Sequence, residues 1–205
     1  MFDEVRVRSL VDDKPVGVAD VRQALGELAT VGPDDVAIVF FAGHGVVRRD
    51  GEAAILTSGA TASEASLEQH SFGWKVLGPA LAAAKGRVLL LLDTCHSGAI
   101  QQSLVASDGQ LAGELLRDGR AGAIVFTAAK GRQVSVEHQG HGDFTRAILE
   151  ALHDPDTDHD RDHVVSVAEL IDEVTRRVAD GSHGQQMPWV ARRETFGDFP
   201  LAPAP

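Results

Sequence analysis

Two short, wholly apolar segments constrain the fold of this chain more than any other feature of its sequence. The first is Val36-Ala-Ile-Val-Phe-Phe41 and the second is Val88-Leu-Leu-Leu-Leu92. A strand that is apolar on both faces is typical of a parallel sheet covered by helices on both sides. Neither segment approaches the roughly 20 apolar residues that a membrane-spanning helix needs. The sequence therefore predicts a buried parallel sheet at the centre of the molecule.

Helical patterns flank these two segments. Apolar residues recur at helical spacing over Val18–Thr30, and further helices are expected near Gly73–Ala84 and over Phe144–Leu152. Ala123–Phe126 predicts a third short buried strand, and Val5–Leu10, which alternates valine with arginine, predicts a half-exposed strand. Strands that alternate with helices indicate an α/β fold with a mainly parallel sheet.

Composition narrows the class of protein. The 205 residues carry a formal net charge of −11, and no linker or repeat divides them, so we expect one domain over residues 1–205. Such a charge argues against nucleic acid and anionic membranes as partners, because both need a positive surface. No signal-peptide pattern opens the sequence, and the expected location is the cytoplasm. Cys95 is the single cysteine, which excludes an internal disulfide and any multi-cysteine metal site.

Polar residues that could take part in a reaction follow the two apolar segments. Gly-His44-Gly45 ends the first segment, and Asp93-Thr-Cys95-His96 ends the second. Sites in open α/β sheets form outside the carboxyl ends of the strands, so His44 and Cys95 are expected to face each other there. His44 would take the thiol proton, and the amides of Gly45 and Cys95 are candidates for stabilising an oxyanion.

His96 is a rival for the role of the base. Neighbouring residues on an extended chain point to opposite sides, which favours His44 and puts Asp93 on the same side as Cys95. A carboxylate beside the nucleophile would attract a basic substrate side chain. The residues alone leave other interpretations open, since a lone cysteine after an apolar strand is more often an inert core residue, and a strand-end aspartate often caps a loop.

These segments resemble the two catalytic segments of the caspase/metacaspase clan of cysteine peptidases. The resemblance is carried by Val-Phe-Phe-Ala-Gly-His44-Gly and by Leu-Leu-Leu-Asp93-Thr-Cys95-His-Ser-Gly. The Asp-x-Cys-His-Ser-Gly form is similar to that of metacaspases and bacterial caspase-like proteins, the orthocaspases, rather than animal caspases. Further similar segments lie at Phe126–Glu137, Gly142–Thr145 and Gly184–Pro188, so the likeness covers nearly the whole chain.

The resemblance implies a caspase-like three-layer sandwich and a cysteine endopeptidase that requires no cofactor. Cys95 matches the nucleophile and His44 the dyad histidine. Asp93 matches a position that lines the primary specificity pocket, which implies cleavage of proteins or peptides after Arg or Lys, and Gly45 is a further substrate-binding candidate. The next pocket-lining strand would carry Gln133, Ser135 and Glu137.

The sequence departs from the family pattern in two places. An acid of the second pocket-lining strand is replaced by Gly131 or Arg132, depending on the alignment. The family's first strand and helix have no counterpart before Val5–Leu10, so either the chain is a fragment of a larger protein or the start of the domain is shortened. In both cases we expect an uncovered sheet edge or gap beside the His44 strand. The alternative function is a catalytically silent caspase-like module that recruits a partner, and other domains of a larger chain are candidate partners.

An acidic loop within residues 154–170 resembles a degenerate EF-hand calcium loop, which makes Ca²⁺ a candidate ligand. His163 stands at position 6, where the EF-hand has glycine. The alternative is a solvated loop before a helix, because Ser166-Val-Ala-Glu169 has the spacing of a capping box. A calcium-sensing regulatory domain is a third candidate function. The ligand positions 1, 3, 5 and 12 would be Asp158, Asp160, Asp162 and Glu169.

Overall fold

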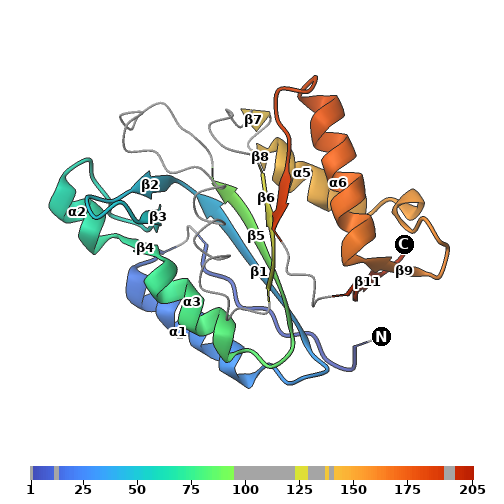
Figure 1. Cartoon of the computed structure of the whole chain (residues 1–205), viewed down its shortest axis with the longest axis horizontal. Coiled ribbons are helices and arrows are strands. Elements are labelled where there is room, and N and C mark those ends of the chain that lie inside the picture. The colour runs from blue at the N-terminus through green and yellow to red at the C-terminus, as the bar shows by residue number, and fades with distance from the viewer. Residues whose placement is uncertain (1, 12–13, 95–122, 129–136, 139–140, 192–196) are drawn as a thin grey trace.

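A four-stranded sheet in the order β1-β5-β6-β10 forms the centre of the structure (Figure 1). This computed structural model describes residues 2–11, 14–94, 123–128, 137–138, 141–191 and 197–205. Three of the strands are parallel and the last is antiparallel, which confirms the predicted mainly parallel sheet. The strands are β1 (Val36–Gly43), β5 (Arg87–Thr94), β6 (Ala123–Thr127) and β10 (Trp189–Ala191).

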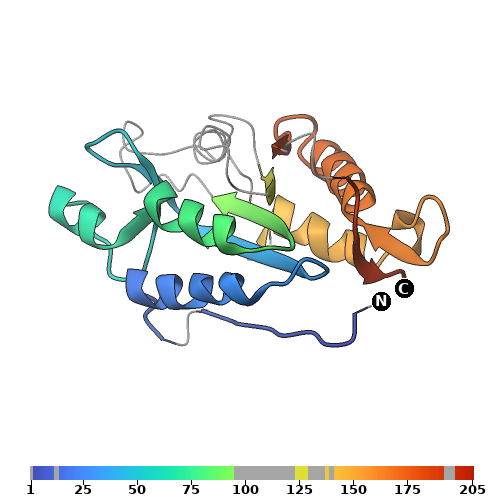
Figure 2. The ribbon, with the colours of Figure 1, turned by 60° about the horizontal axis from the view of Figure 1, so that its bottom comes forward.

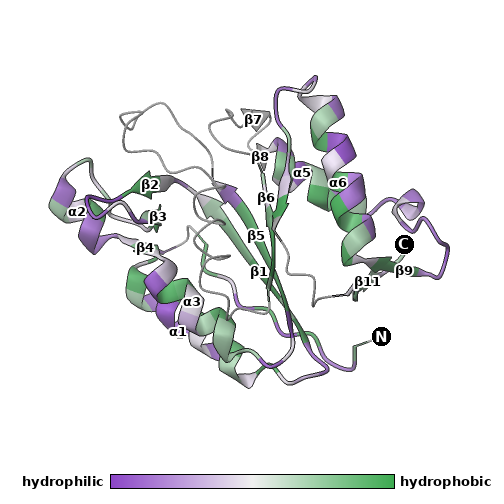
Figure 3. Cartoon of the chain, viewed as in Figure 1, coloured by the Kyte–Doolittle hydropathy of each residue, from purple (hydrophilic) through white to green (hydrophobic). Residues whose placement is uncertain are grey.

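Helices pack on both faces of this sheet and complete a three-layer sandwich. One pair of helices packs on each face. On β5, Leu90 and Leu92 belong to the core beneath the first pair, and Leu89 and Leu91 belong to the core beneath the second pair. Figure 3 shows the apolar residues along β1 and β5 and the mixed surfaces of the helices. The first pair is α1 (Val18–Gly26), continued by the 3-10 turn η1 (Glu27–Thr30), and α3 (Trp74–Ala83); the second pair is α5 (Asp143–Leu152) and α6 (Val167–Gly181).

A small antiparallel sheet continues directly from β1. Its order is β2-β3-β4, and the turn between its first two strands contains Gly51, whose φ of 81° suits glycine. β2 and β3 therefore form a hairpin that follows the end of β1. Its strands are β2 (Gly45–Val47), β3 (Ala53–Leu56) and β4 (Ser71–Gly73), with α2 (Glu64–Gln69) between the last two.

Two further strand pairs lie towards the carboxyl-terminal part of the chain. β9 and β11 pair in antiparallel fashion just before α6, and β7 and β8 form a short antiparallel pair just before α5. The predicted capping box is confirmed, because Ser166 and Glu169 cap the first turn of α6 reciprocally. These elements are β7 (Glu137–His138), β8 (His141–Gly142), β9 (Val164–Ser166), β11 (Pro200–Pro203) and the 3-10 turn η3 (Pro155–Thr157).

The strand that precedes His44 lies at the edge of the described sheet, as expected, but two other expectations about strands are wrong. Val5–Leu10 forms no strand, and Figure 2 shows it as an extended trace without an arrow. The alternating pattern was present, but a strand also needs a partner, and Val5 and Val7 are 78% and 83% exposed. β1 lies at the edge of the described sheet and is not covered on both faces, since Ile38 is 52% exposed. The helices α5 and α6 pack on β5 and β6 instead.

Within the described ranges, no helix is both long enough and apolar enough to cross a bilayer.

Candidate active site

The candidate base lies where two parallel strands end together. His44 is the single residue between β1 and β2, and it is exposed. The parallel register pairs Gly43 of β1 with Thr94 of β5, so both strands end at the same level. Cys95 follows Thr94 in the sequence and lies outside the described residues. The chain positions that carry the candidate base and the candidate nucleophile therefore follow paired residues of adjoining strands.

The hairpin after β1 fixes the backbone around His44. The N–H of Leu56 donates a hydrogen bond of 2.9 Å to the carbonyl oxygen of His44. Hydrogen-bonded and non-hydrogen-bonded pairs alternate along an antiparallel ladder, and Gly45 is the next residue, opposite Ile55. The N–H of the buried Gly45 therefore points away from β3. An amide that stabilises an oxyanion outside the hairpin needs this orientation.

Asp93 is almost completely buried at the carboxyl end of β5, with 3% of its surface exposed. It continues the column of Leu89 and Leu91, which faces α5. The hydroxyl of Thr145, in the first turn of α5, donates a hydrogen bond of 2.5 Å to Asp93 Oδ2. The amino-terminal end of a helix favours negative charge, so this position suits an ionised carboxylate.

Gly142, the N-cap of α5, lies directly against the same carboxylate. A Cβ atom placed on Gly142 would stand 2.8 Å from Asp93 Oδ2, so a glycine is needed for this close approach. Gly142 is also paired with Glu137 in the β7–β8 ladder, which brings the backbone of Glu137 to this end of the sheet. Of the other predicted pocket residues, Gln133 and Ser135 lie outside the described residues.

Sequence reasoning assigned no role to Thr145 or Gly142. Both stand in a segment that resembles the family, but the pattern at the start of a helix does not reveal which distant side chain they contact. Their partner is 52 residues away from Thr145 in the sequence. No local signal in the sequence marked this contact. In the structure, Phe144 packs edge-on against Phe126 of β6 with ring centroids 4.9 Å apart, next to Thr145 in the first turn of α5.

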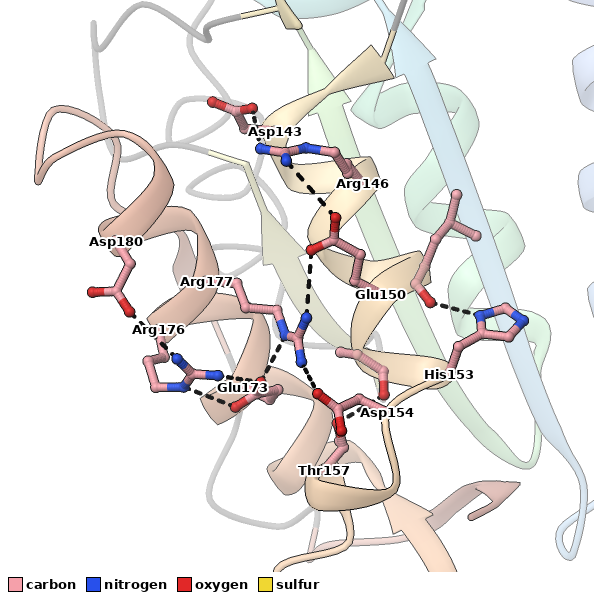
Figure 4. Close-up of polar contacts among 12 residues, drawn as sticks. Asp143, Arg146, Glu150, His153, Asp154, Thr157, Glu173, Arg176, Arg177 and Asp180 are labelled. Carbon is pink, nitrogen blue, oxygen red and sulfur yellow. Dashed lines mark hydrogen bonds and ion pairs between the residues drawn. The ribbon is translucent and has the colours of Figure 1, made fainter. Parts of the chain in front are cut away.

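A network of ion pairs holds α5 and α6 together (Figure 4). Glu173, whose side chain is 7% exposed, accepts hydrogen bonds from Arg176 and Arg177 of its own helix. Arg177 also contacts Glu150 on α5 and Asp154, just beyond the end of that helix. The hydrogen bond from Arg176, with that from Arg177, lowers the pKa of Glu173 despite its burial. The network therefore supports the helix whose first turn contacts Asp93.

The acidic loop brings its three aspartates together. Asp158, Asp160 and Asp162 each offer a carboxylate oxygen, and these oxygens lie within 4.8 Å of one another. His163, at the position expected to hold glycine, adopts a left-handed φ of 69°, so the backbone bends there without glycine. Three carboxylate oxygens at this spacing fit the oxygen ligands that calcium prefers.

Glu169 is engaged with the backbone of the same loop. Its Oε1 accepts from the N–H of His159 at 2.8 Å, and its Oε2 accepts from the N–H of Ser166 at 2.9 Å. Partial burial would raise the pKa of Glu169, but these hydrogen bonds outweigh it, and the pKa lies below the ordinary value. Glu169 thus serves the helix cap and braces the loop, as the alternative interpretation of the motif requires.

Comparisons with known proteins agree with this architecture. A family model described as a caspase domain matches residues 4–200. Solved structures also share the fold, among them a structural-genomics crystal structure of a protein from Geobacter sulfurreducens. That comparison has a TM-score of 0.58 and 18% sequence identity, and it covers 85% of this chain and 72% of that chain. A search of curated proteins returned no match. The identity to the solved structure is low, so that likeness concerns the fold alone.

Proposed function

Because the chain belongs to the caspase family of cysteine peptidases, we propose that it is an endopeptidase with a His44–Cys95 dyad that cleaves after Arg or Lys. The observation that carries the dyad is the pairing of Gly43 with Thr94, the residues just before His44 and Cys95. Protein or peptide chains are the substrate class that a caspase domain implies.

Each catalytic group has a defined task in this proposal. His44 removes the proton of the Cys95 thiol, and the thiolate attacks the carbonyl carbon of the scissile bond. The N–H groups of Gly45 and Cys95 stabilise the oxyanion that forms, where one donor contributes about 3–4 kcal/mol. The C–N bond then breaks, and the protonated His44 transfers its proton to the leaving amine. Water, deprotonated by His44, hydrolyses the thioester and restores the thiol.

Asp93 is the group proposed to select the substrate. It is a carboxylate with 3% exposure, two residues before the nucleophile and on the face of the sheet that carries α5. A guanidinium or ammonium group complements such a carboxylate, because charge-assisted hydrogen bonds to a carboxylate are stronger than neutral ones. Glu137, whose backbone pairs with Gly142 at the same helix start, is a second candidate for contacting the substrate.

Reporter peptides test the proposal directly. Peptides that differ only in the residue before the scissile bond, which is Arg, Lys, Asp or Ala, are incubated with the wild-type chain and with Cys95→Ala. The proposal predicts hydrolysis of the Arg and Lys peptides by the wild type alone. Hydrolysis by Cys95→Ala at the wild-type rate would refute the mechanism, and an inactive wild type would favour the silent module that recruits a partner.

Calcium binding by the acidic loop is a second candidate property, which we propose from the spacing of the three aspartates. Asp158, Asp160 and Asp162 would provide the ligands, and Glu169 would join them only by giving up its bond to the N–H of His159. Calorimetric titration with Ca²⁺ tests this, with Asp160→Asn as the variant and Asp156→Asn as the matched control outside the group. The proposed site is supported if heat of binding is measured for the wild type and the control but not for Asp160→Asn. If the wild type gives no heat of binding, the calcium site is contradicted.

A further inference from the structure

The carboxylate of Asp93 is hydrogen-bonded to one residue at the start of α5 and lies close against another. Thr145 Oγ1 donates a hydrogen bond to Oδ2, and the backbone of Gly142 leaves no room for a Cβ atom beside the same oxygen. Both residues belong to one rigid unit, because Gly142 is the N-cap of α5 and Thr145 lies in its first turn. The orientation of the carboxylate is therefore coupled to the placement of this helix.

We propose that Thr145 is a positioning residue for substrate recognition: its hydroxyl sets the plane of the Asp93 carboxylate so that an arginine side chain is received in two-pronged fashion. This inference rests on the proposed function, and it extends that function to the choice between arginine and lysine. Thr145 acts through Asp93 and contacts no reacting atom in this account.

Arginine and lysine side chains differ in the geometry of their hydrogen-bond donors. A guanidinium group presents two parallel N–H donors in one plane. Its paired hydrogen bonds to a carboxylate reach full strength only when both carboxylate oxygens lie in the plane of the guanidinium group. An ammonium group is a point charge with rotatable donors, so it tolerates a rotated carboxylate. A hydroxyl that fixes the carboxylate should therefore favour arginine more than lysine.

The packing around α5 makes Thr145 suited to this task. The ring of Phe144 is completely buried against Phe126, so the first turn of the helix is anchored to β6. The ion pairs of Arg177 with Glu150 and Asp154 fasten the remainder of α5 to α6. A hydroxyl on a helix held at both ends has little freedom to follow a carboxylate that rotates, and it restrains the rotation instead.

A purely structural role is the competing explanation. In that case the bond would only attach α5 to the end of β5, and its loss would lower the stability without changing the discrimination between substrates. Stability alone therefore does not separate the two roles, whereas the ratio of arginyl to lysyl cleavage does.

Three variants provide the test. Thr145→Val removes the hydroxyl at nearly constant shape, and Thr145→Ser keeps it. Gly142→Ala leaves the hydroxyl in place but adds a methyl group that would stand 2.8 Å from Asp93 Oδ2, so the carboxylate must shift. The backbone of residue 142, at φ −64° and ψ 146°, is a conformation that alanine adopts without strain. The steady-state constants kcat and KM are measured for matched arginyl and lysyl peptides, and thermal unfolding of each variant is recorded.

The inference predicts that Thr145→Val lowers kcat/KM for the arginyl peptide by about 10-fold, mainly through KM, but lowers the lysyl value by no more than about 3-fold. Thr145→Ser restores the wild-type ratio, and Gly142→Ala reduces it as the valine variant does. Equal losses on both peptides, or unchanged kinetics in Thr145→Val, would overturn the inference while the proposed function stands. A wild type that cleaves neither peptide would overturn the proposed function and this inference with it.

Discussion

Arg177 of α6 is hydrogen-bonded to Asp154, the second residue after the end of α5. The same guanidinium donates to Glu173 at 2.6 Å and to Glu150 at 3.4 Å, so one side chain joins both helices and the start of the acidic loop. The helix pair that this network stabilises carries, at its other end, the turn that contacts Asp93.

Loss of Glu173 should destabilise this pair of helices. Glu173→Gln removes a carboxylate with 7% exposure that accepts hydrogen bonds from two arginines, and we expect the free energy of unfolding to fall by about 1.5–3 kcal/mol. Asp180→Asn is the matched control, because Asp180 pairs with Arg176 at a side-chain exposure of 71%, where about 0–1 kcal/mol is expected. Urea unfolding measures both, and equal losses would contradict a special role for Glu173.

The same carboxylate gives the stability a defined dependence on pH. The hydrogen bond from Arg176 and that from Arg177 lower the pKa of Glu173 in the folded chain from its ordinary value of 4.5. Its contribution is therefore complete above about pH 4.5 and is lost as the pH falls through the lowered folded value. Unfolding measured between neutral pH and the acid range should lose stability less steeply in Glu173→Gln than in the wild type. An identical acid slope in the two proteins would contradict this assignment.

Substrate preference should depend on Asp93. Asp93→Asn removes the charge at constant size, and losing one partner of a buried charged pair typically costs about 2–5 kcal/mol. We expect kcat/KM on arginyl peptides to fall by a corresponding factor, while thermal unfolding changes little. Equal cleavage of aspartyl and arginyl peptides by the wild type would show that Asp93 does not select basic residues.

The two histidines that are candidates for the base should differ sharply in importance. His44→Ala is expected to lower kcat by several orders of magnitude, because a base and its nucleophile act as a unit. His96→Ala provides the matched control, since we expect from the sequence alone that neighbouring residues of an extended chain point to opposite sides. Comparison of kcat on an arginyl peptide decides between them, and a larger loss in His96→Ala would reverse the assignment.

Much of the sheet could be predicted because its strands are defined by their own residues. Val88–Leu92 is apolar throughout, and it lies within β5, the strand with cores on both faces. The start of α6 was equally local, since Ser166 and Glu169 cap it within one turn. Such features need no knowledge of the rest of the fold.

Other features depended on contacts between distant parts of the chain. Val5–Leu10 has the alternation of a strand, but pairing requires an adjacent edge, which a local pattern does not reveal. Ile38 has the same apolar character as the residues of β5, yet it is 52% exposed because α5 and α6 pack on β5 and β6 instead. The contact of Thr145 with Asp93 was missed for the same reason, since it joins the start of a helix to the end of a remote strand.

Covalent labelling tests the central claim, that His44 and Cys95 form a peptidase dyad, most directly. The wild type, His44→Ala and Cys95→Ala are incubated with an irreversible arginyl ketone, and intact mass and peptide mapping follow the adduct. The account predicts one adduct on Cys95 in the wild type, formation at least about 100-fold slower in His44→Ala, and none in Cys95→Ala. A wild type that gains no mass, or a His44→Ala chain labelled at the wild-type rate, would contradict it.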